Sequence, residues 1–232
     1  YQELADYVNA YDQKMQMKRE VIADKGIWTA KKRYILNAWD VEGVRYQEPQ
    51  LKVMGQEMVK SSTPAPCREK MREAVKIIMS GTEKDVNDFI QEFREEFMKL
   101  PPEEIAFPRS VNGLSKWSSG HAIFKKGCPI HAKGAILYNH FLRQKKLTNK
   151  YPLIQEGDKI KFINIRTPNP MSSNVISFFT KLPKELDIHK YLDYDMQYEK
   201  AFVEPLTFIM DQIGWNIDRS YGKQTTLEDF FS

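Results

Sequence analysis

The chain has 232 residues, of which 41% are apolar and 28% charged. This composition excludes a disordered polymer and provides for one large or two small hydrophobic cores. No apolar run approaches the roughly 18 to 20 residues that cross a bilayer, and the first residues resemble neither a signal peptide nor a transit peptide. Two cysteines, Cys67 and Cys128, are too few for a disulfide framework, so a reducing, cytoplasmic location is expected. The first residue is Tyr1 rather than Met, which suggests a piece of a longer polypeptide.

The N-terminal quarter is predicted to contain one helix and two strands. Apolar residues recur at helical spacing from Leu4 to Ile22, so the first two dozen residues are expected to form an amphipathic helix. β-branched and aromatic residues predict strands over residues 33–39 and 50–54. The acidic stretch at 40–49 is expected to form the turn between them.

The run Lys31-Lys32-Arg33-Tyr34 places three adjacent cations in this strand pattern. In a strand, Lys32 and Tyr34 would point to one face and Lys31 and Arg33 to the other. Ammonium and phenol donors can reach the minor-groove acceptors of a duplex without regard to sequence, and phosphates can accept the remaining charge. A solvated strand face explains the same four residues, so the motif alone decides nothing.

The run Ser61-Ser62-Thr63-Pro64-Ala65-Pro66 interrupts the pattern and predicts a domain boundary. Its two prolines exclude a helix interior and a central strand. The hydroxyl groups are suited to contact nucleic-acid phosphates, but they are equally suited to cap a helix, and both roles stay open. Beyond the boundary, apolar residues at helical spacing predict helices over residues 71–78 and 86–100.

The remaining elements are mixed. A helix is predicted over residues 132–146, strands over 159–165 and 175–179, and a long last helix over 188–213. Pro205 is expected to bend the last helix, and Gly214 is expected to end it. The whole pattern predicts an α+β fold, in which a helix and strands precede a mainly helical unit with a small β element of its own.

Charge is unevenly distributed within the net value of +4. Residues 109–166 carry twelve Lys or Arg against two acids, a balance of +10, whereas residues 167–232 carry six against ten, a balance of −4. This imbalance is expected of a surface that follows a nucleic-acid backbone, although a solvated basic surface also explains it. The aromatic residues interleaved with the positive charge are Trp117, Phe124, Tyr138 and Phe141.

Two short motifs have the spacing of metal ligands but not the context. Asp193-Tyr194-Asp195 lies in a predicted helix, where side chains two positions apart point away from each other. Cys128 and His131 form a C-x-x-H pair, but no second pair follows at the spacing that structural zinc requires. We therefore expect no metal-binding and no catalytic residue in this chain, and we interpret His131 as a core or DNA-facing histidine.

Four separated blocks resemble one protein family in their order and spacing. They are AKKRY (residues 30–34), LKVMGQEMVKSSTPAP (51–66), KGCPIHAKGAILYN (126–139) and EKAFVEPL (199–206). Together they resemble the C-terminal portion of family B DNA polymerases, most closely the replicative polymerases of T-even-like bacteriophages. The resemblance implies that residues 1–62 are the C-terminal part of the palm, 63–223 the thumb, and 224–232 a sliding-clamp-binding tail.

The same resemblance implies roles for the basic and hydroxyl side chains. This part of a polymerase would grip the primer-template duplex, sense the primer terminus and dock the sliding clamp during template-directed DNA replication. Lys32 and Tyr34 would contact the terminal base pairs in the minor groove, with Lys31 and Arg33 near phosphates or the template. The other implied DNA contacts are Ser61, Ser62 and Thr63 on the primer backbone and Lys125, Lys126 and Lys133 on a thumb surface.

A complete polymerase of this family would need a further, upstream part. That part would carry the metal-binding aspartates, which hold two divalent ions, expected to be Mg²⁺, for in-line phosphoryl transfer. The present chain would then bind primer-template DNA and be inactive in nucleotide transfer by itself. A competing interpretation is a non-catalytic DNA-binding processivity accessory that recruits a sliding clamp. The existence of the upstream partner separates the two.

The C-terminal octapeptide has the pattern of a sliding-clamp-binding peptide. A short 3₁₀-like turn would bring Leu227, Phe230 and Phe231 to one side, where they would enter an apolar pocket while Gln224 forms a hydrogen bond beside it. Exposed aromatic residues at a polar terminus need a partner that buries them. The alternative is that Phe230 and Phe231 fold back onto the core of the chain.

Overall fold

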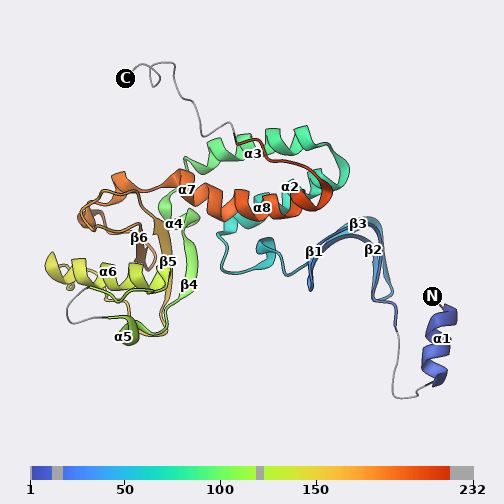
Figure 1. The fold of residues 1–232 in the computed structure, drawn as a ribbon, viewed down its shortest axis with the longest axis horizontal. Coiled ribbons are helices and arrows are strands. Elements are labelled where there is room, and N and C mark those ends of the chain that lie inside the picture. The colour runs from blue at the N-terminus through green and yellow to red at the C-terminus, as the bar shows by residue number, and fades with distance from the viewer. Residues whose placement is uncertain (1, 12–17, 119–122, 220–232) are drawn as a thin grey trace.

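Two small antiparallel sheets lie on either side of a group of packed helices in the computed structural model (Figure 1). The structure describes residues 2–11, 18–118 and 123–219. Each sheet has three strands in sequential order, and helices supply most of the remaining ordered chain. The predicted α+β fold class is confirmed.

The first sheet contains β1 (Val21–Ala30), β2 (Arg33–Val41) and β3 (Val44–Met54). Two-residue turns join the strands, at Lys31-Lys32 and at Glu42-Gly43, and three of these four residues have positive φ. Positive φ at both Glu42 and Gly43 is typical of the tight turns whose twist matches that of paired strands. The turn predicted over residues 40–49 is therefore much shorter than expected.

The predicted N-terminal helix is too long. Helix α1 (Gln2–Tyr11) lies apart from the rest of the described chain (Figure 1), and Ile22 belongs to β1 instead. The segment contains β-branched residues that suit a strand, and pairing with β2 buries Ile27 against Ile35. That burial requires the partner strand, so local spacing between Leu4 and Ile22 did not indicate it.

The two faces of the first sheet have different environments. Ile27, Ile35 and Val53 lie opposite one another in neighbouring strands, and the first two are buried in the main core. The residues one position further along each pairing, Trp28, Tyr34 and Met54, also lie opposite one another, and Trp28 is 61% and Met54 44% exposed. Because successive residues of a strand face opposite sides, one face of the sheet holds the fold and the other is open.

The helical group is built from α2 (Ala65–Ser80), α3 (Glu83–Phe97) and the helices near the C-terminus. The apolar stripes predicted for α2 and α3 are buried, which confirms both helices. A capping box between Thr82 and Asp85 begins α3. The aromatic centre of this group comprises Phe93, Phe97, Tyr198 and Phe202, with ring centroids 4.7 Å apart for Phe93 and Phe202 and 5.1 Å apart for Phe97 and Tyr198.

The predicted last helix is divided into shorter pieces. A 3₁₀ turn η3 (His189–Tyr191) comes first, and the helix proper begins with α7 (Tyr194–Tyr198), continues through a π-helical turn η4 (Glu199–Val203) and α8 (Glu204–Met210), and ends with the 3₁₀ turn η5 (Asp211–Ile213). Pro205 lacks an N–H group, and the π turn that ends two residues before it accommodates the missing hydrogen bond. Gly214 ends the helix with a φ of 71°, as predicted.

The second sheet contains β4 (Phe107–Ser110), β5 (Lys159–Asn164) and β6 (Val175–Phe178), and α6 (Ile130–Gln144) packs against it. The predictions for β5, β6 and α6 are confirmed with shifts of one or two residues. The short edge strand β4 was not predicted, because it contains Pro108 and follows the short helix α4 (Pro102–Ile105). A Cβ atom at Gly134 would lie 2.4 Å from Ser177 Oγ, so glycine permits the close approach of α6 to β6.

Candidate nucleic-acid interface

A cleft of about 520 Å³ lies where the first sheet, the segment that precedes α2, β4, η4 and α8 meet. We call it the Arg33 cleft. Four cationic side chains and two carboxylates line it, namely Arg33, Lys60, Arg109 and Lys200 with Glu57 and Glu204. Ser62, Thr63 and Phe208 also line it. The structure therefore brings together three of the predicted DNA-binding residues, Arg33, Ser62 and Thr63, in a cleft with an excess of positive charge.

A second cleft, of about 560 Å³, adjoins the first, because Lys200 lines both. We call it the Arg166 cleft. It extends past Arg166 to Ile130, the first residue of α6, and to Asn174. Asn174 Oδ1 accepts a hydrogen bond from Lys133 Nζ at 3.0 Å. The two clefts thus share Lys200, and five cations (Arg33, Lys60, Arg109, Arg166 and Lys200) line them against three carboxylates (Glu57, Asp193 and Glu204). This excess of positive charge is suited to attract a phosphodiester backbone.

The lysines of the KKRY run lie in a turn and not in a strand. Lys31 and Lys32 connect β1 to β2, Lys32 has a φ of 62°, and both are exposed. The predicted alternation of these two side chains between sheet faces is therefore wrong, because pairing with β1 reverses the chain between Ala30 and Arg33. Tyr34 is half-buried on the open face of the sheet, directly opposite Trp28.

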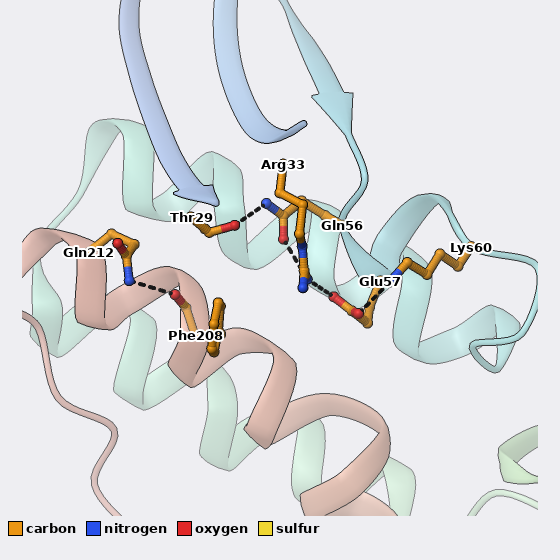
Figure 2. Close-up of polar contacts among 7 residues, drawn as sticks. All are labelled: Thr29, Arg33, Gln56, Glu57, Lys60, Phe208 and Gln212. Carbon is orange, nitrogen blue, oxygen red and sulfur yellow. Dashed lines mark hydrogen bonds and ion pairs between the residues drawn. The ribbon is translucent and has the colours of Figure 1, made fainter. Parts of the chain in front are cut away.

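The partly exposed side chain of Arg33 contacts two neighbouring elements of the protein. Its Nη2 atom lies 2.6 Å from Glu57 Oε2, and its guanidinium lies 5.5 Å from the ring centroid of Phe208 (Figure 2). Its side chain is 29% exposed. Glu57 also forms an ion pair with Lys60, at 2.7 Å. Part of the positive charge at the edge of the Arg33 cleft is therefore compensated within the protein.

The hydroxyl run lies between η1 (Glu57–Val59) and α2. Ser61 is exposed, Ser62 is half-buried and Thr63 is 5% exposed. The residue at the N-cap of α2 is Pro64, with no side-chain capping bond. Capping of α2 therefore does not explain the three hydroxyl groups, and Ser62 and Thr63 lie at the wall of a positively charged cleft instead.

The three predicted thumb lysines gather around the start of α6. Lys125 and Lys126 are exposed in the loop that precedes this helix, and Lys125 Nζ donates to the carbonyl oxygen of Lys116 at 2.7 Å. Lys133 Nζ lies 5.1 Å from the ring centroid of Phe124 in addition to its bond to Asn174. Tyr138, predicted to be among the aromatic residues of this surface, is buried, and burial raises the pKa of its hydroxyl to about 12. It belongs to the core.

The motifs with metal-ligand spacing have other partners. Asp193 accepts from the backbone N–H of Met196 at 3.0 Å and begins α7, and Asp195 forms an ion pair with Arg94 at 2.6 Å. Burial lowers the pKa of His131, as does the positive charge of Arg109. Within the described ranges, no group of three His, Cys, Asp or Glu side chains is arranged to hold a metal ion. These residues do not fit the two divalent ions of a complete polymerase.

Both cysteines in the structure are free thiols. Cys67, in the first turn of α2, is fully buried in the core, and burial raises its pKa to about 12. Burial also raises the pKa of the partly exposed Cys128. Neither thiol is activated as a nucleophile, since activation requires a lowered pKa.

Sequence reasoning missed several residues of this surface. Arg109 was counted in the basic segment, and Lys200 lies inside the EKAFVEPL block, but neither was proposed as a contact. Trp28 stands three residues before the KKRY run and is exposed beside Tyr34. Its position shortly before the resembling block at residues 30–34 was the available signal. The predicted clamp-binding residues Gln224, Leu227, Phe230 and Phe231 lie outside the described residues.

Comparison with known proteins relates this chain to part of a DNA-directed DNA polymerase. The chain is 32% identical over 244 residues to the DNA-directed DNA polymerase of Enterobacteria phage T4, which covers 100% of the chain and 26% of the phage protein. It is 36% identical over 219 residues to the enzyme of the same description from Escherichia phage RB69, which covers 89% of the chain and 24% of that protein. The chain thus spans about a quarter of the length of these relatives. The predicted resemblance to T-even-like phage polymerases is confirmed.

Two further findings complete the comparison. No protein-family model matches the chain. Among the described helices, none has the length and apolar character needed to span a membrane.

Proposed function

We propose that the chain is the C-terminal palm and thumb part of a family B DNA-directed DNA polymerase and that it holds primer-template duplex DNA during template-directed replication. Residues 1–62 would belong to the palm, 63–223 to the thumb and 224–232 to a clamp-docking tail. The observation that carries the proposal is the excess of positive charge in the Arg33 and Arg166 clefts, which share Lys200 and whose cations come from segments far apart in the sequence. The relationship to two phage polymerases supports it.

The duplex would contact this surface mainly through its backbone. Lysine and arginine side chains neutralise phosphates without regard to base sequence, which is what a replicative enzyme requires. Lys32 and Tyr34 would meet the minor groove near the primer terminus, and Lys31 and Arg33 would lie near phosphates or the template, because the exposed turn directly precedes Arg33, which lines the Arg33 cleft. Hydroxyl groups of Ser62 and Thr63 would accept or donate hydrogen bonds at the primer strand.

The tail would add processivity without adding contacts to the duplex. A peptide that docks Leu227, Phe230 and Phe231 in a clamp pocket keeps the chain at high effective concentration beside the DNA that the clamp encircles. Sliding clamp, primer-template DNA and an upstream polymerase part are the proposed partners. The two divalent ions would be held by the upstream part.

Primer extension tests the proposed division of labour. We expect no extension when this chain is mixed with primer-template, deoxynucleotides and Mg²⁺, because its aspartates at 193 and 195 are engaged elsewhere. Adding the upstream polypeptide is expected to restore extension. Extension by this chain alone would contradict the proposal, and duplex binding without any restored extension would favour a non-catalytic processivity accessory.

A further inference from the structure

Glu57 connects the KKRY turn to the rest of the molecule through Arg33. Arg33 is the first residue of β2 and directly follows the turn at Lys31 and Lys32, while Glu57 is the first residue of η1. The ion pair between them measures 2.6 Å, and the two side chains are only 29% and 26% exposed (Figure 2). Because the pair is partly withdrawn from water, its geometry is better defined than that of an exposed ion pair.

A second contact holds the other strand of the same hairpin. Gln56 is 1% exposed, and its Nε2 atom donates to Thr29 Oγ1 at 2.9 Å (Figure 2). Its Oε1 atom lies 3.4 Å from Arg33 Nη2. Thr29 lies near the end of β1, so Gln56 and Glu57 together bind the strands on both sides of the turn.

The backbone before η1 also abuts the turn. Gly55 has a φ of 69°, and a Cβ atom at this position would lie 2.5 Å from the carbonyl oxygen of Lys32. Phe208 of α8 completes the contact, since its ring lies beneath the Arg33 guanidinium. The turn, η1 and α8 therefore meet at one arginine.

We infer that Glu57 is a positioning residue for DNA binding, which fixes the Lys31-Lys32 turn beside the Arg33 cleft by holding Arg33. The inference rests on the proposed function, because it concerns how the same surface meets a duplex. A carboxylate in a cleft that binds a polyanion lowers affinity by charge repulsion. The contacts of Glu57 with Arg33 act in the other direction, because they hold the turn in place and so raise affinity. The change in affinity on substitution of Glu57 shows which of the two effects is larger.

Binding of a fluorescent primer-template duplex to the full chain provides this test. In the positioning account, Glu57→Gln weakens binding by about 3- to 10-fold, because the coupling energy between the paired side chains disappears and the turn is released. If charge alone mattered, the same substitution would tighten binding, since it removes a negative charge and frees Lys60. Glu204→Gln is the matched control, because it removes a carboxylate from the same cleft but leaves the ion pair between Arg33 and Glu57 in place. It is expected to tighten binding, because it removes a negative charge from the cleft.

A double-mutant cycle separates positioning from a general loss of stability. Lys31→Ala/Lys32→Ala is measured in the wild-type chain and in the Glu57→Gln chain, at a temperature where thermal scans show both to be folded. The lysine substitutions are expected to cost less affinity in the Glu57→Gln background, because the turn is no longer fixed there. If Glu57 had a purely structural role, Glu57→Gln would lower the melting temperature, and the lysine substitutions would cost the same DNA affinity in both backgrounds.

The outcomes for the inference and for the proposed function are distinct. Tighter binding by Glu57→Gln, or an equal lysine cost in both backgrounds, overturns the positioning role and leaves the proposed function intact. A wild-type chain that does not bind the duplex, or that loses no affinity in Lys31→Ala/Lys32→Ala, overturns both.

Discussion

Replacement of Phe93 by alanine is expected to lower the free energy of unfolding by about 3 to 5 kcal/mol, the largest stability effect that we predict for a single substitution. Phe93 is 2% exposed and contacts the rings of Phe97, Tyr198 and Phe202. Its removal leaves a cavity in the contact between α3 and the last helices, and it also removes edge-to-face ring contacts. Chemical denaturation followed by circular dichroism measures the change.

Phe89→Ala is the matched control for that measurement. Phe89 lies in the same helix and is the same residue type, but it is only partly buried, beside Lys70. It is expected to cost clearly less than Phe93→Ala, because less apolar surface returns to water. Equal losses for the two variants would mean that the aromatic cluster is not the centre of this core.

Simultaneous replacement of Lys125, Lys126 and Lys133 by alanine is expected to have the largest effect on DNA binding. If these lysines neutralise phosphates, their removal weakens binding to all duplex sequences alike. It also flattens the dependence of log K on log salt concentration, by roughly 0.9 for each phosphate that is no longer neutralised. Anisotropy titrations of one duplex at several salt concentrations provide the slope.

A second triple variant controls for net charge. Lys76, Lys84 and Lys99 are exposed on or next to α2 and α3, away from both clefts. Their replacement by alanine changes the net charge by the same amount, and we expect a much smaller change of the salt slope. Identical slopes for the two triple variants would show that the lysines around α6 contribute only to the general charge of the protein.

The elements that could be predicted from the sequence are those whose pattern is local. Helices α2, α3 and α6 show apolar stripes at helical spacing, and β5 and β6 are short segments rich in isoleucine and phenylalanine between turn residues, so each was recognised without its partners. Strand β1 was not, because Leu4 to Ile22 also fits a helical repeat and only pairing with β2 shows which arrangement buries Ile27. The last helix was expected to be continuous because its apolar positions hide the π turn that precedes Pro205.

The candidate site was predicted in its parts but not in its assembly. The residue types of KKRY and of the hydroxyl run pointed to a nucleic-acid backbone, yet nothing local showed that Arg33 would turn inward toward Glu57 and Phe208. Arg109 joins Arg33 in one cleft although the two residues are far apart in the sequence. Such long-range contacts depend on the packing of β4 and α8 beside the first sheet, which spacing along the chain does not encode.

Hydrogen–deuterium exchange of the chain with and without primer-template duplex tests the central claim most directly. The account predicts slower exchange on binding at the turn around Lys31, at the stretch from Lys60 to Thr63, around Arg109 and at the start of α6, since these segments line or adjoin the two clefts. It predicts no change on the exposed side of α3. Protection confined to α3, or absent from the segments that line the clefts, would contradict the account.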